Sequence, residues 1–146
     1  MKSTCCYHKL TEDECKDLLT QNGINKTKSK ISILLKLSES KEPLSAQQIF
    51  DELDSCDLST VFRTLSQFKE KNLVQEVNLD EGFLRFQLIL NDHHQHHHHF
   101  VRCRNCGKIA QIENCDLSIF EKAIKELGFT QMEHRLEFSG LCSRCS

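Results

Sequence analysis

Residues 92–106 read DHHQHHHHFVRCRNC, a histidine run followed closely by a Cys-x-x-Cys pair, and a second such pair occupies residues 142–145. Each pair lets two thiolates reach one ion from a tight turn, and two pairs complete the tetrahedral four-sulfur site that structural zinc prefers. The alternative, two redox dithiols, is disfavoured because no thioredoxin-like strand–helix–strand pattern surrounds either pair. The spacing therefore predicts a zinc site formed by Cys103, Cys106, Cys142 and Cys145.

The composition allows one ordinary domain or two small ones: 146 residues, 38% hydrophobic, with a net charge of −2. No window approaches the eighteen or so apolar residues of a membrane span, and the N-terminus lacks the apolar core of a signal peptide. We therefore expect a cytoplasmic protein with no membrane partner. Its nine cysteines would stay reduced there, which favours metal binding over disulfides. Four cysteines without ligand spacing are expected to be ordinary thiols: Cys5, Cys6, Cys15 and Cys56.

The first ninety residues predict helices followed by a β-hairpin. Capping boxes at residues 11–14 and 45–48 mark two helix starts. A further helix follows the sequence NKTKSK, and another begins near Ser59. Residues 73–90 predict two strands around a glycine-containing turn. The last three of these four helices, followed by the hairpin, have the order of a winged helix-turn-helix, a DNA-binding module.

The helix near Ser59 has a face suited to a DNA major groove. Its apolar stripe consists of Val61, Leu65 and Phe68. Ser59 and Arg63 lie opposite that stripe, Thr60 stands at the helix start, and Phe62 lies at the stripe's edge. Hydroxyls can bind phosphate, Phe can contact thymine methyls, and Arg can bind guanine or phosphate. An amphipathic helix with a half-buried Phe is the alternative. The lysine-rich stretch 26–41 is likewise either a DNA contact or a solvated helix face.

After the histidine run the pattern changes to that of a small α/β domain. Residues 99–103 and 107–113 predict two strands, residues 115–128 a helix, and residues 135–142 a third strand. The apolar side expected to face inward on that helix consists of Phe120, Ala123, Ile124 and Leu127. The predicted fold class is thus α+β, with one domain over residues 1–90 and a second over residues 91–146.

The histidines offer ligand pairs from a single strand. Because side chains alternate along a strand, His97 and His99 share one face, and His96 and His98 share the other. If the four cysteines join the strands around them, His134 can approach His97 and His99. Imidazole suits zinc, iron, nickel and copper, so these residues limit the metal without naming it. A polar hinge with adventitious metal affinity is the alternative.

Four stretches together resemble the ferric-uptake-regulator (Fur) family of metal-responsive bacterial repressors. They are LSAQQIFDEL, DLSTVFRTLSQFKEKNLV, HHHHFVRCRNCGKI and GFTQMEHRLEFSGLCSRC, and the resemblance covers residues 23–145. It implies a homodimer with N-terminal winged helices and C-terminal dimerisation domains. It also implies that metal binding closes the dimer onto AT-rich palindromic operators in double-stranded DNA.

The resemblance also assigns individual residues. It places the structural zinc on Cys103, Cys106, Cys142 and Cys145. It places DNA contacts on Lys26, Ser59, Thr60, Phe62 and Arg63, with Phe62 standing where the family usually has Tyr. His97 and His99 match the pair that joins His134 in the family's dimerisation-domain site, and Cys115 or Asp116 is the nearest fourth ligand. An interdomain site would use His98 with His93, Asp92 or Glu76. A one-residue bulge would instead move His97 and His99 into that interdomain site.

Departures from the family pattern bear on the metal that is sensed. Phe100 stands where a histidine is common, Gln111 where a glutamate is common, and Glu42-Pro43 where a histidine usually precedes LSA. These departures favour a zinc-responsive repressor with structural Zn²⁺ and regulatory Zn²⁺, over one whose regulatory ion is Fe²⁺. A peroxide-sensing member is a further alternative within the family. An enzyme such as a zinc hydrolase is disfavoured because no HExxH-type motif is present, and a metal-storage protein leaves the STVFR helix without a purpose.

Overall fold

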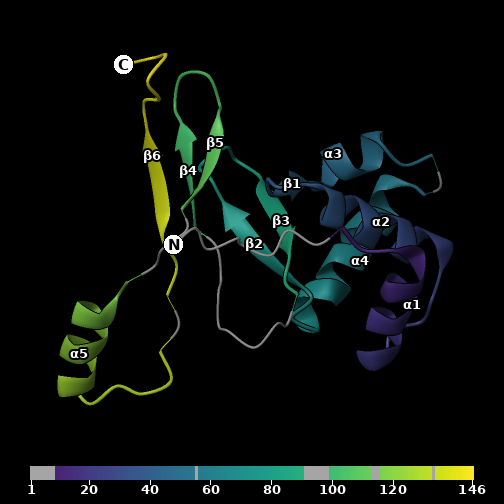
Figure 1. Ribbon diagram of the computed structural model, residues 1–146, viewed down its shortest axis with the longest axis horizontal. Coiled ribbons are helices and arrows are strands. Elements are labelled where there is room, and N and C mark those ends of the chain that lie inside the picture. Colours follow the sequence, from purple (N-terminus) through teal and green to yellow (C-terminus); the bar gives the residue numbers. More distant parts are fainter. Residues whose placement is uncertain (1–8, 55, 91–98, 113–115, 133) are drawn as a thin grey trace. The chain divides into compact units, whose positions relative to one another are not determined.

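The computed structural model describes residues 9–54, 56–90, 99–112, 116–132 and 134–146, in two compact units, Met1–Gln95 and His96–Ser146. The first unit contains α1 (Glu12–Gln21), α2 (Lys28–Glu39), β1 (Leu44–Ser45), α3 (Ala46–Asp51), α4 (Leu58–Glu70), β2 (Val74–Asn78) and β3 (Leu84–Leu88) (Figure 1). The second contains β4 (His99–Cys103), β5 (Ile109–Ile112), α5 (Ser118–Glu126) and β6 (Glu137–Gly140). Helices with small sheets form an α+β fold, as predicted. Within the described residues, no helix has the length and apolar character of a membrane span.

The helix starts of the first unit follow from side-chain caps. Both predicted capping boxes are confirmed: the Thr11 hydroxyl accepts from the Glu14 amide at 3.3 Å, and the Ser45 hydroxyl accepts from the Gln48 amide at 3.1 Å. The predicted start of α4 is one residue late, because Asp57 caps the helix and accepts from the Thr60 amide at 2.6 Å. This carboxylate satisfies an amide that the first helical turn would leave unbonded.

The core of the first unit lies between the helices and the sheet. On α4 the predicted apolar stripe is confirmed, since Val61, Leu65 and Phe68 are all at most 1% exposed. These side chains pack with α2 residues such as Ile33 and Leu34 in one cluster of buried residues. Burial of this stripe fixes which side of α4 remains outward, and that side carries the predicted DNA contacts.

The hairpin of β2 and β3 forms the wing predicted from residues 73–90. β3 lies between β1 and β2, and both pairings are antiparallel. Arg85 of β3 fixes the wing to α3: its Nε and Nη2 donate to the Glu81 carboxylate at 2.6 and 3.0 Å. Its Nη1 donates to the Pro43 carbonyl at 3.2 Å and to Gln48 Oε1 at 2.8 Å. The same Gln48 side chain completes the cap of α3, so the wing and the helix-turn-helix share one polar network.

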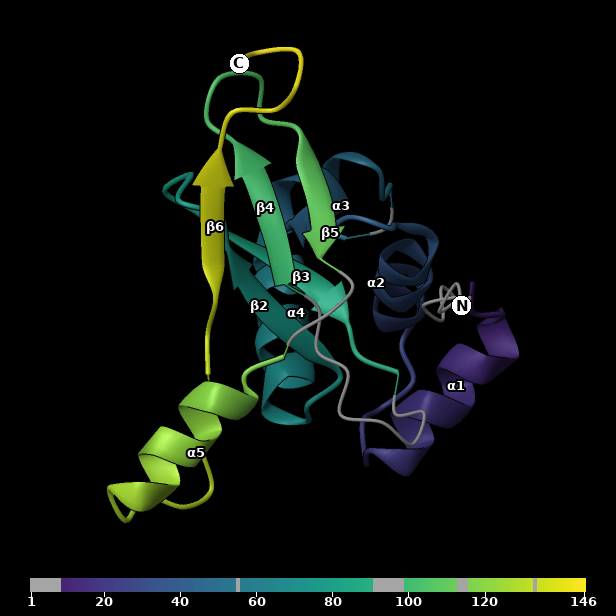
Figure 2. The same ribbon diagram turned by 60° about the vertical axis from the view of Figure 1, so that its left-hand side comes forward.

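The second unit is built on a three-stranded sheet with β4 in the centre (Figure 2). β4 pairs with β5 antiparallel and with β6 parallel. The parallel register places Phe100 beside Glu137 and Cys103 beside Gly140. In this unit the buried apolar side chains among the described residues are Phe100, Cys103 and Ile109. A core this small gives the sheet little stability of its own.

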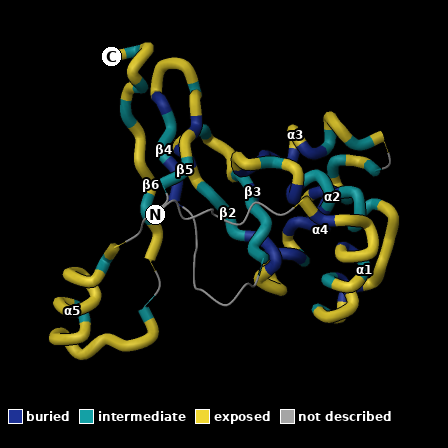
Figure 3. Tube along the Cα trace, in the orientation of Figure 1, coloured by how far each residue is buried: buried dark blue, intermediate teal, exposed yellow. Residues whose placement is uncertain are grey.

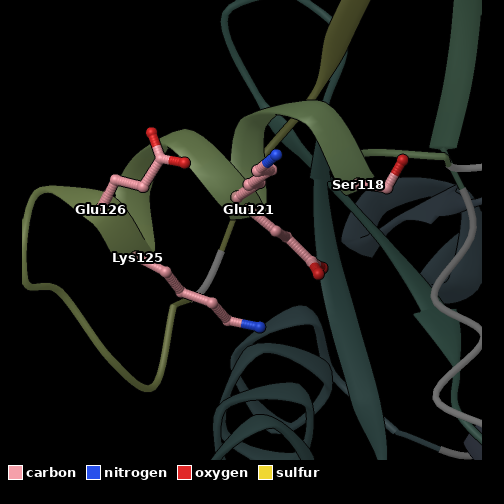
Figure 4. A pocket seen from close by; sticks show the side chains of 5 residues that line it. Ser118, Glu121, Lys125 and Glu126 are labelled. Carbon is pink, nitrogen blue, oxygen red and sulfur yellow. The ribbon is translucent and has the colours of Figure 1, made fainter.

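Helix α5 is shorter and more exposed than the sequence predicts. It begins at Ser118, and Cys115 lies outside the described residues. The prediction that Phe120 and Leu127 face inward is wrong for the single chain, because they are 64% and 74% exposed. Exposed residues predominate along α5 (Figure 3). The helix is nevertheless amphipathic, with an apolar side and a polar side. A shallow hollow of about 430 Å³ on one face is lined by polar and charged side chains (Figure 4), namely Ser118, Glu121, Lys122, Lys125 and Glu126.

Candidate metal centre and nucleic-acid interface

The sheet of the second unit brings the four predicted zinc ligands together. Cys103 ends β4, and because β6 runs parallel to β4 with Gly140 beside Cys103, Cys142 follows two residues beyond that pair. The Cys142 amide donates to Cys103 Sγ at 3.3 Å. Cys106 lies in the turn between β4 and β5, where Gly107 has a φ of +71°, a backbone conformation that favours glycine. Two tight turns therefore meet at one end of the sheet.

The sulfur geometry fits a tetrahedral ion. The Sγ atoms of Cys103, Cys106, Cys142 and Cys145 all lie within 4.8 Å of one another. The Sγ atoms of Cys106 and Cys142 are 3.6 Å apart. Zinc–sulfur bonds of about 2.3 Å in a tetrahedron place sulfurs roughly 3.8 Å apart, so a small contraction of the cluster completes a Zn²⁺ site. The residues present fit the ion that their spacing predicts.

The pKa values of three of these thiols are shifted in different directions. Backbone N–H groups of Cys106 and Cys142 stabilise the Cys103 thiolate and lower its pKa to about 6. The Arg144 amide lowers the pKa of Cys142. The Asn105 side chain alone would lower the pKa of Cys145, but hydrogen bonds with Cys142 and the other sulfurs, together with burial, raise it to about 12. Clustered thiolates repel one another, so all four ionise together only around a cation.

A second pair of potential ligands lies on the same two strands. His99 opens β4, and His134 lies three residues before the start of β6; their Nε2 atoms are 3.1 Å apart. The ring centroids are 5.2 Å apart, and the ring planes are tilted by 39°. His99 is 6% exposed, whereas His134 is exposed. Two Zn–N bonds of about 2.0–2.1 Å place nitrogens roughly 3.3 Å apart, so both Nε2 atoms can reach one ion.

The other expected sensing ligands do not complete this pair in the described part of the chain. His93, His97, His98 and Cys115 lie outside the described residues. Asp116 accepts from the Ser118 amide at 3.1 Å, and hydrogen bonding with Ser118 lowers its carboxyl pKa. Among the described residues, no third His, Cys, Asp or Glu joins His99 and His134 in a ligand cluster. Glu76, considered for an interdomain site, is paired with Lys69 at 2.6 Å.

Four of the five predicted DNA contacts lie on the outward side of α4, and the fifth, Lys26, precedes α2. Phe62 is 52% exposed, which is far more than a packing role requires. Arg63 lies along the helix, with Nε 3.4 Å from the Ser59 carbonyl and Nη2 3.4 Å from Thr60 Oγ1. Ser59 is exposed and Thr60 is half-buried at the first turn. The buried stripe and this outward set share one helix, so the structure brings these four residues to one surface.

Among the lysines and arginines of the first unit, several pair with a carboxylate and several others do not, within the part of the chain that the structure describes. Lysines 9, 16, 36 and 69 and Arg85 each pair with a carboxylate. Lys26, Lys28, Lys30 and Arg63 make no ion pair with any residue that the structure describes. These free cations lie just before α2, in its first turn, and on α4. Positive charge is thus available where α2 begins and where the outward side of α4 lies.

Comparison with known proteins gives a consistent result. Residues 21–139 match the Ferric uptake regulator family. The Peroxide operon regulator of Bacillus subtilis is 31% identical over 138 residues, covering 91% of this chain and 92% of that protein. The Ferric uptake regulation protein of Campylobacter jejuni is 28% identical over 138 residues, covering 90% and 85%.

Solved structures show the same fold at low identity. The ferric uptake regulator of Helicobacter pylori aligns with a TM-score of 0.71 at 19% identity, covering 94% of this chain and 95% of that one. A likeness at that identity establishes the architecture, and the predicted arrangement of a winged helix with a smaller α/β domain is confirmed by it.

Proposed function

The chain belongs to the Ferric uptake regulator family, and from this premise we propose that it is a zinc-responsive repressor that binds DNA as a homodimer. Membership makes it a metal-responsive transcriptional regulator rather than an enzyme. The choice of zinc rests on one observation above all. His99 and His134 hold their Nε2 atoms 3.1 Å apart in the same sheet that gathers the four cysteines.

The donor chemistry supports zinc over iron as the regulatory ion. Neutral imidazoles with a thiolate or one carboxylate suit a four-coordinate Zn²⁺ site. Sites for Fe²⁺ more often use several oxygen ligands and higher coordination. Phe100 and Gln111 face each other across β4 and β5, and neither can ligate as the histidine and glutamate common in the family would. Phe100 is only 2% exposed, so it serves the core instead.

The two proposed zinc sites have different roles, one structural and one regulatory. Zn²⁺ on Cys103, Cys106, Cys142 and Cys145 supplies the charge that holds four thiolates together and is structural. Regulatory Zn²⁺ is bound by His134 with histidines of the 92–99 run and with Cys115 or Asp116. These ligands release protons as they bind, so affinity falls as pH falls. The bound ion favours one angle between the two units, and repression rises only as far as the ion prefers that state.

DNA binding is assigned to α4. Phe62 offers an exposed ring for thymine methyl groups, which favours AT-rich operators, and Arg63 offers a guanidinium for guanine or phosphate. Ser59 and Thr60 contribute hydroxyls at the first turn, and Lys26 adds charge before α2. In a homodimer two copies of α4 would enter successive major grooves of a palindromic operator. A zinc uptake regulator has been solved with zinc and DNA, at a TM-score of 0.64 and 20% identity.

The dimer interface is assigned to the apolar side of α5. Ile119 is 82% exposed and Leu127 is 74% exposed, alongside the outward Phe120. Soluble monomers seldom leave such a row uncovered, and a second copy of the chain covers it. Ile119→Lys with Leu127→Lys should give a monomer in sedimentation velocity, while Lys122→Gln on the polar face should remain dimeric. A double variant that sediments as a dimer would place the interface elsewhere.

The regulatory site is tested by His134→Ala. A binding duplex is first selected from a random-sequence pool with zinc-loaded protein, and affinity is then measured by fluorescence anisotropy across free zinc concentrations. The variant should lose the zinc-dependent gain in affinity and still retain one tightly bound zinc per chain on its cysteines. Gln131→Ala, which changes another residue between α5 and β6, serves as the control. Unchanged zinc dependence in His134→Ala would contradict the assignment.

The similarity to a peroxide operon regulator supports one further candidate, a peroxide sensor. In that case iron bound by histidines would catalyse oxidation of one of its own ligands. Iron-loaded protein treated with peroxide would then show one added oxygen on a histidine peptide by mass spectrometry. Zinc-loaded protein provides the control, because zinc has no redox chemistry. We expect no such modification in a zinc-responsive repressor.

A further inference from the structure

A hollow of about 390 Å³ lies between the first turn of α2 and one side of α4. The N-cap and first turn of α2 contribute Thr27, Ser29 and Lys30, and α4 contributes Thr60, Arg63, Thr64 and Gln67. Every lining side chain is a hydroxyl, an amide or a cation, and no carboxylate is among them. A concave surface with this lining favours an anion with several oxygens.

The α2 side of the hollow carries uncompensated positive charge. Thr27 caps the helix, and the first turn of α2 contains no acidic residue. The first amides of a helix precede its internal hydrogen bonds and carry the positive end of its dipole. Lys30 adds a full charge, and it makes no ion pair with the described residues. The ammonium is therefore free to bind a ligand from outside the chain.

Thr64 gives a second, independent indication of a ligand on the α4 side. Its residue is only 4% exposed, and it lines the hollow. Its hydroxyl makes no hydrogen bond within the part of the chain that the structure describes, whereas Thr20 on α1 donates to a carbonyl four residues earlier. The hydroxyl belongs to a residue that lines the hollow, so it is available to donate to a ligand bound there.

We propose that this hollow holds one phosphate group of the DNA backbone. The proposal rests on the proposed DNA-binding function and adds a positioning site to it. Lys30 and Arg63 supply charge, and the hydroxyls of Thr64 and Ser29 donate to phosphate oxygens. Phosphate contacts fix the register of a protein on DNA, whereas base contacts specify sequence. A phosphate seated here sets the depth at which α4 enters the groove, with Phe62 left for the bases.

Thr64→Val tests the hydroxyl with almost no change of shape. Because the hydroxyl has no partner in the described chain, its removal should leave the thermal midpoint unchanged or raised. Affinity for a labelled duplex of arbitrary sequence should fall about fivefold, as expected for one lost hydrogen bond. A duplex of arbitrary sequence is suitable because backbone contacts do not depend on sequence.

Lys30→Gln tests the charge, and Lys28→Gln is its matched control. Both lysines lie in the first turn of α2 and lack ion pairs in the described chain, but only Lys30 lines the hollow. Lys30→Gln should weaken binding about tenfold and reduce the slope of log affinity against log salt by about 0.9. Lys28→Gln should change both quantities much less. Each lysine variant is then combined with Thr64→Val. The losses of binding free energy should be non-additive for Lys30→Gln with Thr64→Val and additive for Lys28→Gln with Thr64→Val.

Two results separate this proposal from the one on which it rests. If Thr64→Val binds as tightly as wild type, or if the two lysine variants behave alike, the phosphate site is overturned while DNA binding stands. If zinc-loaded wild-type protein binds no duplex, the proposed function fails and the phosphate site fails with it. A stable Thr64→Val variant with weakened binding and Lys30-specific loss of salt slope would support the site.

Discussion

Removal of the zinc ion should unfold the second unit and leave the first unit folded. Among the described residues of the second unit, Phe100 and Ile109 are the large buried apolar side chains. Burying two such side chains contributes about 3–6 kcal/mol. Structural zinc sites of this kind bind with apparent energies of roughly 10–16 kcal/mol at neutral pH. The ion thus contributes more than the apolar core of this unit across the whole of both ranges.

Hydrogen exchange followed by mass spectrometry gives a separate result for each unit. Reduced protein treated with a strong zinc chelator should lose protection in β4, β5 and β6, including the Arg104 amide that donates to the Gly140 carbonyl at 2.8 Å. Amides of α2 and α4 should stay protected. Cys106→Ser should behave as the chelated protein does, and Cys56→Ser should behave as wild type. Full protection of β4 and β5 in metal-free, reduced protein would refute the reasoning.

Three further predictions follow from burial in the first unit. Phe68→Ala should lower the free energy of unfolding by about 3–5 kcal/mol in urea titrations, whereas Phe62→Ala should leave stability nearly unchanged and weaken DNA binding. Arg85→Met should cost about 3 kcal/mol because it removes the guanidinium that pairs with the Glu81 carboxylate at 9% side-chain exposure, and adding Glu81→Met should recover much of that loss. Cys15 should resist iodoacetamide at pH 8 until the chain unfolds, since burial raises its thiol pKa to about 11; rapid native labelling would contradict this.

Local signals in the sequence were sufficient wherever neighbouring residues decide the structure. The two capping boxes, the apolar stripe of α4 and the hairpin all depend on residues within a few positions of one another. The zinc cluster was predictable for a different reason, because Cys-x-x-Cys fixes the geometry of each half and four thiolates need one ion. In each case spacing along the chain determines spacing in three dimensions.

Features that depend on distant or absent partners were harder to predict. The apolar side of α5 has a clear helical period, but period alone does not tell whether its own chain or a second copy covers it. Thr64 gave no signal at all, since its unpartnered hydroxyl and its place in a hollow follow from how α2 packs on α4. Lys30 lies in a lysine-rich stretch, but the sequence of that stretch does not show that Lys30 lacks a carboxylate partner among the described residues.

The parallel pairing of β4 with β6 links the two metal sites physically. At one end of this strand pair Cys103 lies beside Gly140, and at the other end His99 lies close to His134. A zinc ion on the cysteines would fix the register of β6 against β4, and a strand slipped by two residues would move His134 by roughly 7 Å. Two imidazoles can share an ion only at the native register. Under the proposed function the structural ion would therefore be a precondition for sensing, and protein stripped of it should lose the regulatory site even with every histidine intact.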